Sequence, residues 1–485
     1  MQLDANKEKW IKWGFWLVYT IVFIGIAYKA FTVPITHDEG WTVIQYLDES
    51  VWDIMMYPDN WPNNHILNTI LAKVSAGIFG VHDWSVRLPN LLFYWVYAYG
   101  VYRFLRVVLK GKMLLFIPTA ALFVLSPYFL DFFGLCRGYG ISSALTMLSV
   151  GYFASGFLLQ KNKHIWLAFS FALIASYANF TVLLFFAASC LIAALYFLLY
   201  RKNWMDAFKN WGIQILVFLL YAWLIYIPIY KMKSTNQFEF WTSKGFYEET
   251  VFSVIHNSLT DSALYTNHEL FAILVVVLAI LLWLVGILKV IRSSSMKAAF
   301  QGPIVIVGAI LLVTIGINFL QTSILGDPNL NGRTALFLLP VFLSLVACGI
   351  AFLPKGNRNW ISIAAGVFLI LVTIQHLGMS YRPNSFKEWR YDEHTDEVIT
   401  YLNEQNQSTD KLKLSVHWLY YNSFEFYALH QKNNWVLMPV QGQLSTPWDA
   451  DYCYVPEEDV PVLVRAFEVV ETYEGGQTLM RRIRL

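Results

Sequence analysis

Long apolar segments, separated by short polar connections, dominate the pattern of residues along the chain. A helix needs about 20 apolar residues to cross the hydrocarbon core of a bilayer. On this basis we predict eleven membrane-spanning segments, at 13–33, 86–108, 113–130, 141–160, 164–178, 180–200, 211–230, 269–291, 303–323, 334–353 and 360–378. The pattern therefore predicts an α-helical polytopic membrane protein.

The connection between the first two spans, residues 34–85, has a helical pattern of its own. Apolar residues recur at helical spacing in two stretches, first from Trp41 to Met55 and then from Ile66 to Phe79. One-sided stretches of this kind favour helices that lie in the plane of the membrane interface. A turn-rich connector, 57–65, separates them. The alternative is a simple surface that rests on the membrane.

After the last span the chain becomes hydrophilic, and its pattern changes to short alternating runs. A helix start is predicted near 391–402 and a helix at 422–430, with strands at 412–418, 435–440, 452–455, 462–470 and 478–483. We therefore predict a membrane domain at 1–378 and a small α/β domain at 379–485. The small domain has neither a glycine-rich phosphate loop nor a GxSxG motif.

Composition agrees with the membrane class. Of the 485 residues, 57% are apolar and only 14% are charged, whereas ordinary soluble domains have about 25% charged residues. The net charge of +2 does not point to a partner, and we predict no nucleic-acid partner. The four cysteines show no metal-ligand spacing, so no metal site is predicted. The sequence leaves the cofactor open, since it neither requires nor excludes a divalent metal.

Basic residues predict the orientation of the spans, because cytoplasmic connections are enriched in Lys and Arg. With the N-terminus inside, every inner connection is short and basic, and the longest connections, 34–85 and 231–268, lie outside with the C-terminal domain. We predict an integral, multi-pass protein of the bacterial inner membrane. Its N-terminus is expected in the cytoplasm and its C-terminal domain in the periplasm.

Two adjacent acids, Asp38 and Glu39, follow the first span and lie on the predicted outer face. Charge is costly near hydrocarbon, so an ionisable pair at this place is a functional-site hypothesis. The simpler reading is that both residues solvate the end of a helix. Ionisable residues within the spans are scarce, and this argues against an ion or proton path through the membrane.

Two outer arginines break the charge pattern. Arg137 and Arg333 lie in outer connections that are otherwise poor in basic residues. Guanidinium groups bind phosphate in a bidentate manner and keep their charge. We therefore expect both to bind the phosphate of an anionic headgroup or leaving group at the interface. The alternative is a lone interfacial arginine that simply reaches lipid phosphates. His37 and His65 are candidates for polar partners of the acids, and together with the acids His65 has the chemistry of a metal ligand.

Four motifs resemble the GT-C superfamily of membrane glycosyltransferases, in the branch of protein O-mannosyltransferases and lipid A aminoarabinose transferases. They are HDEGW after the first span, NNHILNTILAKVSAGIFGVHDWSVRLPNLL before the second, LSPYFLDFFGLCRGYGISSALTML, and GRTALFLLP. The resemblance covers the first 150 residues well, the middle by topology and the C-terminal domain poorly. The chain departs from the family at Asn64-His65-Ile66, where His-Pro or Pro-Pro is frequent.

The resemblance implies transfer of a sugar to an acceptor hydroxyl at the outer face. It assigns catalysis to Asp38, with Glu39 as the neighbouring acid. We further expect His37, Asn64, His65 and Tyr139 to position the substrate. Soluble nucleotide sugars do not reach this face, so the expected donor is a polyprenyl-phosphate sugar. We expect Asp38 to act as general base in a single, inverting displacement. The acceptor is left open among lipid, glycan and protein.

Two other classes of function remain open at the level of the sequence. A lipid-headgroup-binding transporter or flippase without transferase activity would need polar residues along several spans, and the spans here are mostly plain. A non-catalytic scaffold with a sensing outer domain is the other alternative. Transfer of a labelled sugar from a polyprenyl-phosphate donor distinguishes both from an enzyme.

Overall fold

The computed structural model describes residues 5–59, 61–200, 204–235, 245–259, 267–293, 302–353, 359–405, 411–439 and 449–483. These residues are mostly helical and form two compact units. The first unit, here the bundle unit, comprises residues 1–26, 55–68 and 90–381. The second, here the loop-tail unit, comprises residues 27–54, 69–89 and 382–485, so it joins parts of the first connection to the C-terminal segment.

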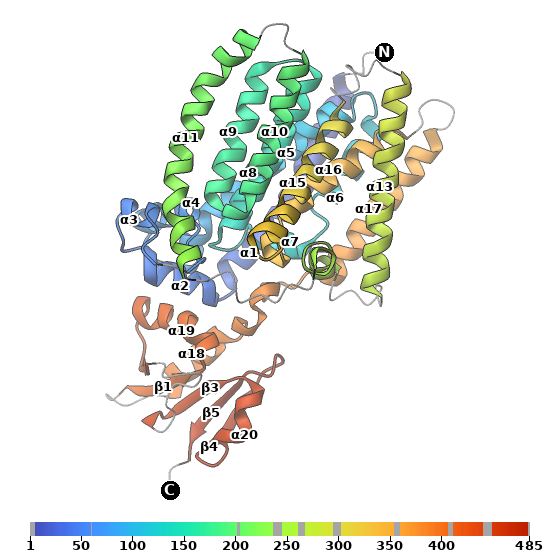
Figure 1. Cartoon of the computed structure of the whole chain (residues 1–485). Helices are drawn as coiled ribbons and strands as arrows, with labels where there is room; N and C mark the ends of the chain where they lie inside the picture. Colours follow the sequence, from blue (N-terminus) through green and yellow to red (C-terminus); the bar gives the residue numbers. More distant parts are fainter. Residues whose placement is uncertain are drawn as a thin grey trace. The chain divides into compact units, whose positions relative to one another are not determined.

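The bundle unit combines long helices with a few short ones, among them α6 (Phe116–Leu122), α7 (Pro127–Asp131) and α12 (Ser253–Leu259) (Figure 1). Within the described ranges, seven helices are long and apolar enough to cross a membrane, and the chain is an integral multi-pass membrane protein. Two helices, α1 (Ala5–Thr32) and α5 (Asp83–Val108), are shared by both units. After α5, the α-helices of the bundle unit are α6, α7, α8 (Gly138–Leu158), α9 (Asn162–Ala178), α10 (Leu183–Tyr200), α11 (Trp204–Ser234), α12, α13 (His268–Ser293), α15 (Pro303–Leu325), α16 (Leu338–Ile350) and α17 (Asn359–Ser380).

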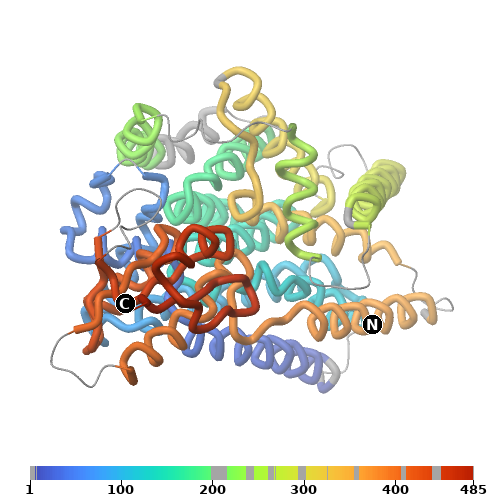
Figure 2. The backbone as a smooth tube through the Cα atoms, turned by 90° about the horizontal axis from the view of Figure 1, so that it is seen from below, coloured from blue at the N-terminus to red at the C-terminus, as the bar shows by residue number. Residues whose placement is uncertain are grey.

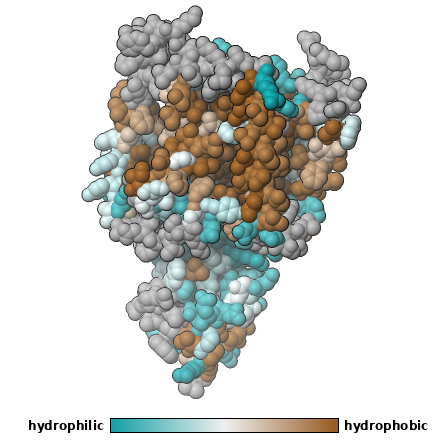
Figure 3. Space-filling model, turned by 45° about the vertical axis from the view of Figure 1, so that its right-hand side comes forward, coloured by the Kyte–Doolittle hydropathy of each residue, from teal (hydrophilic) through white to brown (hydrophobic). Residues whose placement is uncertain are grey.

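Helix α8 lies in the middle of the bundle. It is 89% buried, whereas α13 is only 17% buried over its most apolar window. Small residues allow α5 and α8 to approach closely, since a Cβ on Gly100 would lie 2.8 Å from the backbone nitrogen of Leu148. Hydrophobic side chains cover much of the helical surface seen in Figure 3. An outward apolar surface is what lipid contact requires.

Seven of the eleven predicted spans coincide with these long apolar helices, and the total of eleven is not established. The prediction of one continuous span at 113–130 is wrong. There, α6 ends at Leu122 and α7 begins at Pro127, because proline disfavours helical backbone at Ser126. The hydroxyl of Ser126 instead accepts a hydrogen bond from the Phe129 amide at 3.2 Å and caps α7. Similarly, α16 is shorter than the predicted span at 334–353.

The first connection contains three helices where its apolar pattern predicts two, because the first predicted stretch is interrupted between residues 46 and 51. They are α2 (His37–Tyr46), α3 (Val51–Met55) and α4 (Ile66–Phe79). Tyr57, with a φ of +63°, follows α3 in the turn-rich connector. Helix α2 and residues 69–79 of α4 belong to the loop-tail unit.

The C-terminal segment forms one five-stranded mixed sheet with helices beside it, and its backbone makes one cluster in Figure 2. The strand order is β2-β1-β3-β5-β4, with β1 parallel to β2 and β3, and β5 antiparallel to β3 and β4. The elements are α18 (Thr395–Gln405), β1 (Leu412–Val416), α19 (Trp418–His430), β2 (Trp435–Leu437), β3 (Tyr452–Val455), α20 (Val460–Leu463), β4 (Phe467–Thr472) and β5 (Thr478–Arg482). The strand predicted at 462–470 starts five residues later, because Pro461 begins α20.

Candidate active site

The predicted site residues are divided between the two units. Asp38, Glu39 and His37 lie in the loop-tail unit, and Asn64, His65, Arg137, Tyr139 and Arg333 lie in the bundle unit.

Helix α2 presents the two adjacent acids. Thr36 is its N-cap, so His37, Asp38 and Glu39 occupy the first three helical positions. The backbone amide and the hydroxyl of Thr36 both donate to Oε2 of Glu39, each at 3.0 Å. An N-cap threonine with a glutamate three residues later is a sequence signature of a helix start. The local sequence therefore determines where α2 begins and where Glu39 points.

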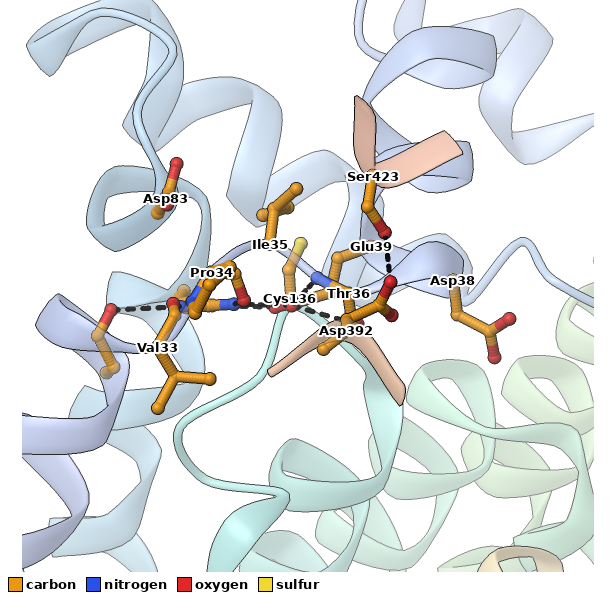
Figure 4. Close-up of polar contacts among 12 residues, drawn as sticks. Val33, Pro34, Ile35, Thr36, Asp38, Glu39, Asp83, Cys136, Asp392 and Ser423 are labelled. Carbon is orange, nitrogen blue, oxygen red and sulfur yellow. Dashed lines mark hydrogen bonds and ion pairs between the residues drawn. The ribbon is translucent and has the colours of Figure 1, made fainter. Parts of the chain in front are cut away.

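The Glu39 carboxylate forms a buried ion pair with Arg87. Nε of Arg87 donates to Oε1 of Glu39 at 2.9 Å, and Nη2 donates to Oε2 at 2.7 Å. Both side chains are fully buried. The same guanidinium also donates to the carbonyl oxygens of Val33 at 2.6 Å and Pro34 at 2.8 Å (Figure 4). These contacts make Glu39 an anchor of the loop.

Arg87 was not among the residues expected in the site. The ring of Phe386 lies over its guanidinium, with 5.1 Å from the ring centroid to Cζ. The signal that points to Arg87 is its position near the start of an apolar segment, where an arginine calls for a buried partner. The acid that pairs with it is 48 positions earlier in the chain, so the sequence pattern does not show which acid that is.

Asp38 points differently from Glu39, because successive residues of a helix are rotated by about 100°. Its side chain is partly buried and points away from Glu39 in Figure 4. Its backbone carbonyl accepts a hydrogen bond from the Thr42 hydroxyl at 2.9 Å. The two neighbouring acids thus have different surroundings, since Glu39 is fully buried in its ion pair with Arg87 and Asp38 is partly buried.

The C-terminal segment contacts the start of α2. The backbone amide of His37 donates to Oδ2 of Asp392 at 2.8 Å, and the Ser423 hydroxyl donates to Oδ1 at 2.7 Å. The Asn422 amide lies 2.9 Å from Nε2 of His37. His37, at the start of α2, therefore contacts α19 as a polar partner of Asn422.

Tyr427 makes a second connection between the same segments. Its hydroxyl donates to Oδ2 of Asp83 at 2.6 Å and accepts the backbone amide of Ile35 at 2.9 Å. Burial raises the pKa of the Asp83 carboxyl, and the charge of Arg87 opposes that rise. Residues before α2, at the start of α5 and on α19 are thus joined through one hydroxyl group.

Burial raises the pKa of Asp392 well above its ordinary value, and the Asp38 and Glu39 charges add to the rise while the bonds from Ser423 and His37 oppose it. The folded state therefore binds more protons than the unfolded state above about pH 4. Stability is expected to fall as the pH rises from the unfolded pKa to the folded one. Thermal unfolding between pH 4 and 8 should show this slope in the wild type and a flatter one in Asp392→Asn. Parallel curves would contradict it.

Four predicted residues lie in two neighbouring segments of the bundle unit. Arg137 is buried, and its Nη1 donates to the carbonyl oxygen of Asn63 at 3.3 Å. The ring of Tyr139 packs edge-on against His65, with 4.8 Å between the centroids. Asn64 is buried beside His65 in the chain. A Cβ on Gly138 would lie 2.0 Å from the carbonyl oxygen of Ala178, so this arrangement requires glycine there.

Arg333 lies in a different part of the bundle unit. It lies in a 3-10 turn, Gly332–Ala335, just before α16. The backbone amide of Gly332 donates to the Ser253 hydroxyl at 2.9 Å, so α12 holds this turn. Of the described residues, no three among His, Cys, Asp and Glu form a group that would hold a metal ion.

No family model and no curated protein matches the chain. The structure is similar to ArnT from Cupriavidus metallidurans in the apo state, with a TM-score of 0.51, 10% identity, and coverage of 97% of this chain and 98% of that one. ArnT bound to undecaprenyl phosphate gives a TM-score of 0.46 at 12% identity, covering 97% and 98% of the two chains. AglB from Archaeoglobus fulgidus, in complex with an inhibitory peptide and a dolichol-phosphate, gives a TM-score of 0.46 at 12% identity, with coverage of 98% of this chain and 74% of that one.

The likeness to apo ArnT extends over nearly the whole of both chains and shows a shared fold. It agrees with the predicted fold, in which membrane helices are followed by a small C-terminal domain that contains a sheet.

Proposed function

We propose that this chain is a GT-C glycosyltransferase that moves a sugar from a polyprenyl-phosphate donor to an acceptor hydroxyl at the outer face of the membrane. The observation that carries the proposal is the presentation of Asp38 by a buried, ion-paired loop within an ArnT-like fold. A partly buried acid on a turn that an ion pair holds in place suits general base catalysis, because the base needs a fixed position beside the reacting proton.

The proposed step is a single displacement at the anomeric carbon. The acceptor hydroxyl transfers its proton to Asp38 as its oxygen forms the new bond to that carbon. The bond from the anomeric carbon to the phosphate oxygen breaks, and the polyprenyl phosphate leaves with the electron pair. The anomeric centre is inverted. Glu39 and Arg87 take no part in bond changes and hold the loop.

In this proposal Arg137 and Arg333 bind the donor phosphate, and fixed positive charge there stabilises the leaving group as its negative charge grows. His65, Tyr139 and Asn64 are buried in the segments that carry Arg137 and its partner Asn63, and they position a substrate. The orientation inferred from the basic residues places the reaction in the periplasm, where the donor has to arrive within the membrane. Lipid, glycan and protein are the acceptor classes to be tested.

The direct test uses the purified full chain in proteoliposomes, with polyprenyl-phosphate-linked mannose or aminoarabinose carrying a radiolabel in the sugar. Cell-envelope lipid, glycan and protein fractions serve as separate acceptors. Label should appear in one acceptor fraction, and polyprenyl phosphate should be released in equal amount. Binding or movement of the donor without any release of polyprenyl phosphate would instead favour a transporter or flippase.

Arg137→Ala is expected to raise KM for the lipid donor about 10- to 100-fold, because a charge-assisted hydrogen bond contributes about 1.5–3 kcal/mol. The measurement is initial transfer rate against donor concentration. Arg465→Ala is the control, since Arg465 is an exposed arginine of the C-terminal segment. An unchanged donor KM in Arg137→Ala would remove Arg137 from the donor site.

A further inference from the structure

The first residue of α2 is held by an acid from a distant part of the chain. Asp392 lies 355 positions after His37 in the sequence, at the end of a 3-10 turn, Lys387–Asp392. One of its carboxyl oxygens accepts the His37 amide at 2.8 Å, and the other accepts the Ser423 hydroxyl at 2.7 Å. The side chain is only 2% exposed. Both oxygens therefore have defined partners in a dry environment, which gives the bond to His37 a fixed geometry.

A second contact lies on the other side of Asp38 along the helix. Gly40 packs against the backbone of α19, where a Cβ would lie 2.3 Å from the carbonyl oxygen of Asn422 and 2.7 Å from its carbonyl carbon. Only glycine allows this approach without a shift of one helix. Helices α2 and α19 lie against each other within the loop-tail unit (Figure 1).

Asp38 is thus bracketed by two contacts with the C-terminal segment, one at His37 and one at Gly40. The ion pair of Glu39 with Arg87 anchors the same turn to the start of α5. The first turn of α2 has little freedom left between these attachments. A change in the C-terminal attachments would move or loosen the backbone that carries Asp38.

We propose that Asp392 is a positioning residue, through which the C-terminal segment sets the place of the Asp38 carboxylate; this inference rests on the proposed function. The pKa of Asp392 is raised, chiefly by burial. The C-terminal segment therefore contributes to catalysis although it does not touch the reacting atoms.

Asparagine can make the same two contacts, because its carbonyl oxygen accepts the His37 amide and its nitrogen donates to the Ser423 hydroxyl. Asp392→Asn should therefore keep kcat within about twofold of the wild type. Asp392→Ala leaves the buried His37 amide without this acceptor and should lower kcat about tenfold or more, with the donor KM little changed. Hydrogen exchange at residues 37–40 should become about tenfold faster in Asp392→Ala and remain near wild type in Asp392→Asn.

Two glycine variants probe the same contact without altering a charge. Gly40→Ala should speed exchange at 37–40 and lower kcat, because the added methyl group collides with α19. Gly77→Ala, in α4 of the same unit, is the matched control, since a Cβ there meets nothing within 4 Å. Leu463→Ala, in the core of the C-terminal sheet, controls for general weakening of that segment.

Hydrogen exchange and transfer rates together distinguish failure of the positioning contact from failure of the proposed function. Unchanged exchange at 37–40 in Asp392→Ala overturns the positioning contact, whatever the transfer rates are. Faster exchange with wild-type kcat overturns the catalytic consequence alone, and so does an equal loss of kcat in Leu463→Ala. A wild type that transfers no sugar overturns the proposed function and the link to catalysis, while exchange still decides whether Asp392 holds α2.

Discussion

Asp38→Asn is expected to lower the rate of sugar transfer about 100- to 10,000-fold, the range that a general base typically contributes. The amide is nearly the same size as the carboxylate but does not accept the acceptor's proton at neutral pH. The anchor of the loop remains, because the buried ion pair uses Glu39 and Arg87. The variant should therefore insert, fold and bind the donor like the wild type while the chemical step fails.

Asp48→Asn is the matched control for this loss, since Asp48 is an exposed acid two residues after α2. Transfer is measured from labelled donor in proteoliposomes, and folding is monitored by thermal unfolding of the same preparations. Near-normal turnover in Asp38→Asn would eliminate Asp38 as the base. A similar loss in both variants would instead indicate a general effect of charge in the first connection.

Arg87→Met is expected to destabilise the folded protein by about 3–5 kcal/mol, the cost of leaving one member of a buried ion pair without its partner. Arg87 donates to both oxygens of Glu39 and to backbone carbonyl oxygens before α2. Removing it leaves the Glu39 charge buried and several acceptors unpaired. The loss should appear as a lower denaturation midpoint, and it should be accompanied by a loss of transfer activity.

A double-variant cycle separates the pair from the rest of the loop. Glu39→Gln together with Arg87→Met should cost less than the sum of the single variants, because neither then leaves an isolated charge. Unfolding in denaturant, measured for all four proteins in one detergent, provides the comparison. Additive losses would show that Arg87 stabilises the loop through the backbone carbonyl oxygens and not through Glu39.

The local sequence was sufficient for features whose causes lie within a few residues. Thr36 and Glu39 form an N-terminal capping pair, and α2 starts where they predict. The apolar stretches of the first connection became α2, α3 and α4, and the alternating runs after residue 411 became strands. Errors occurred where proline interrupts a hydrophobic run, at Ser126-Pro127 and at Pro461, since hydropathy alone does not register the change in backbone geometry.

The site shows the same division. Adjacency and charge marked Asp38 and Glu39 as one acidic pair, and only the family resemblance distinguished Asp38 as the expected base. The fold gives them different surroundings, since Glu39 meets the buried guanidinium of Arg87 while the Asp38 side chain points elsewhere. The sequence did not point to Asp392 at all. The observation that marks Asp392 is its bond to a backbone amide 355 residues away, and such a contact leaves no local pattern.

The sequence by itself determined the membrane class, most of the helices and the acidic turn after the first span, because these follow from the spacing of apolar residues, helix caps and the cost of charge near lipid. The tertiary structure decided which acid is paired, which arginine pairs with it and which distant carboxyl holds the turn. Those choices depend on desolvation and on contacts between segments far apart in the chain, and neither is encoded in the order of neighbouring residues.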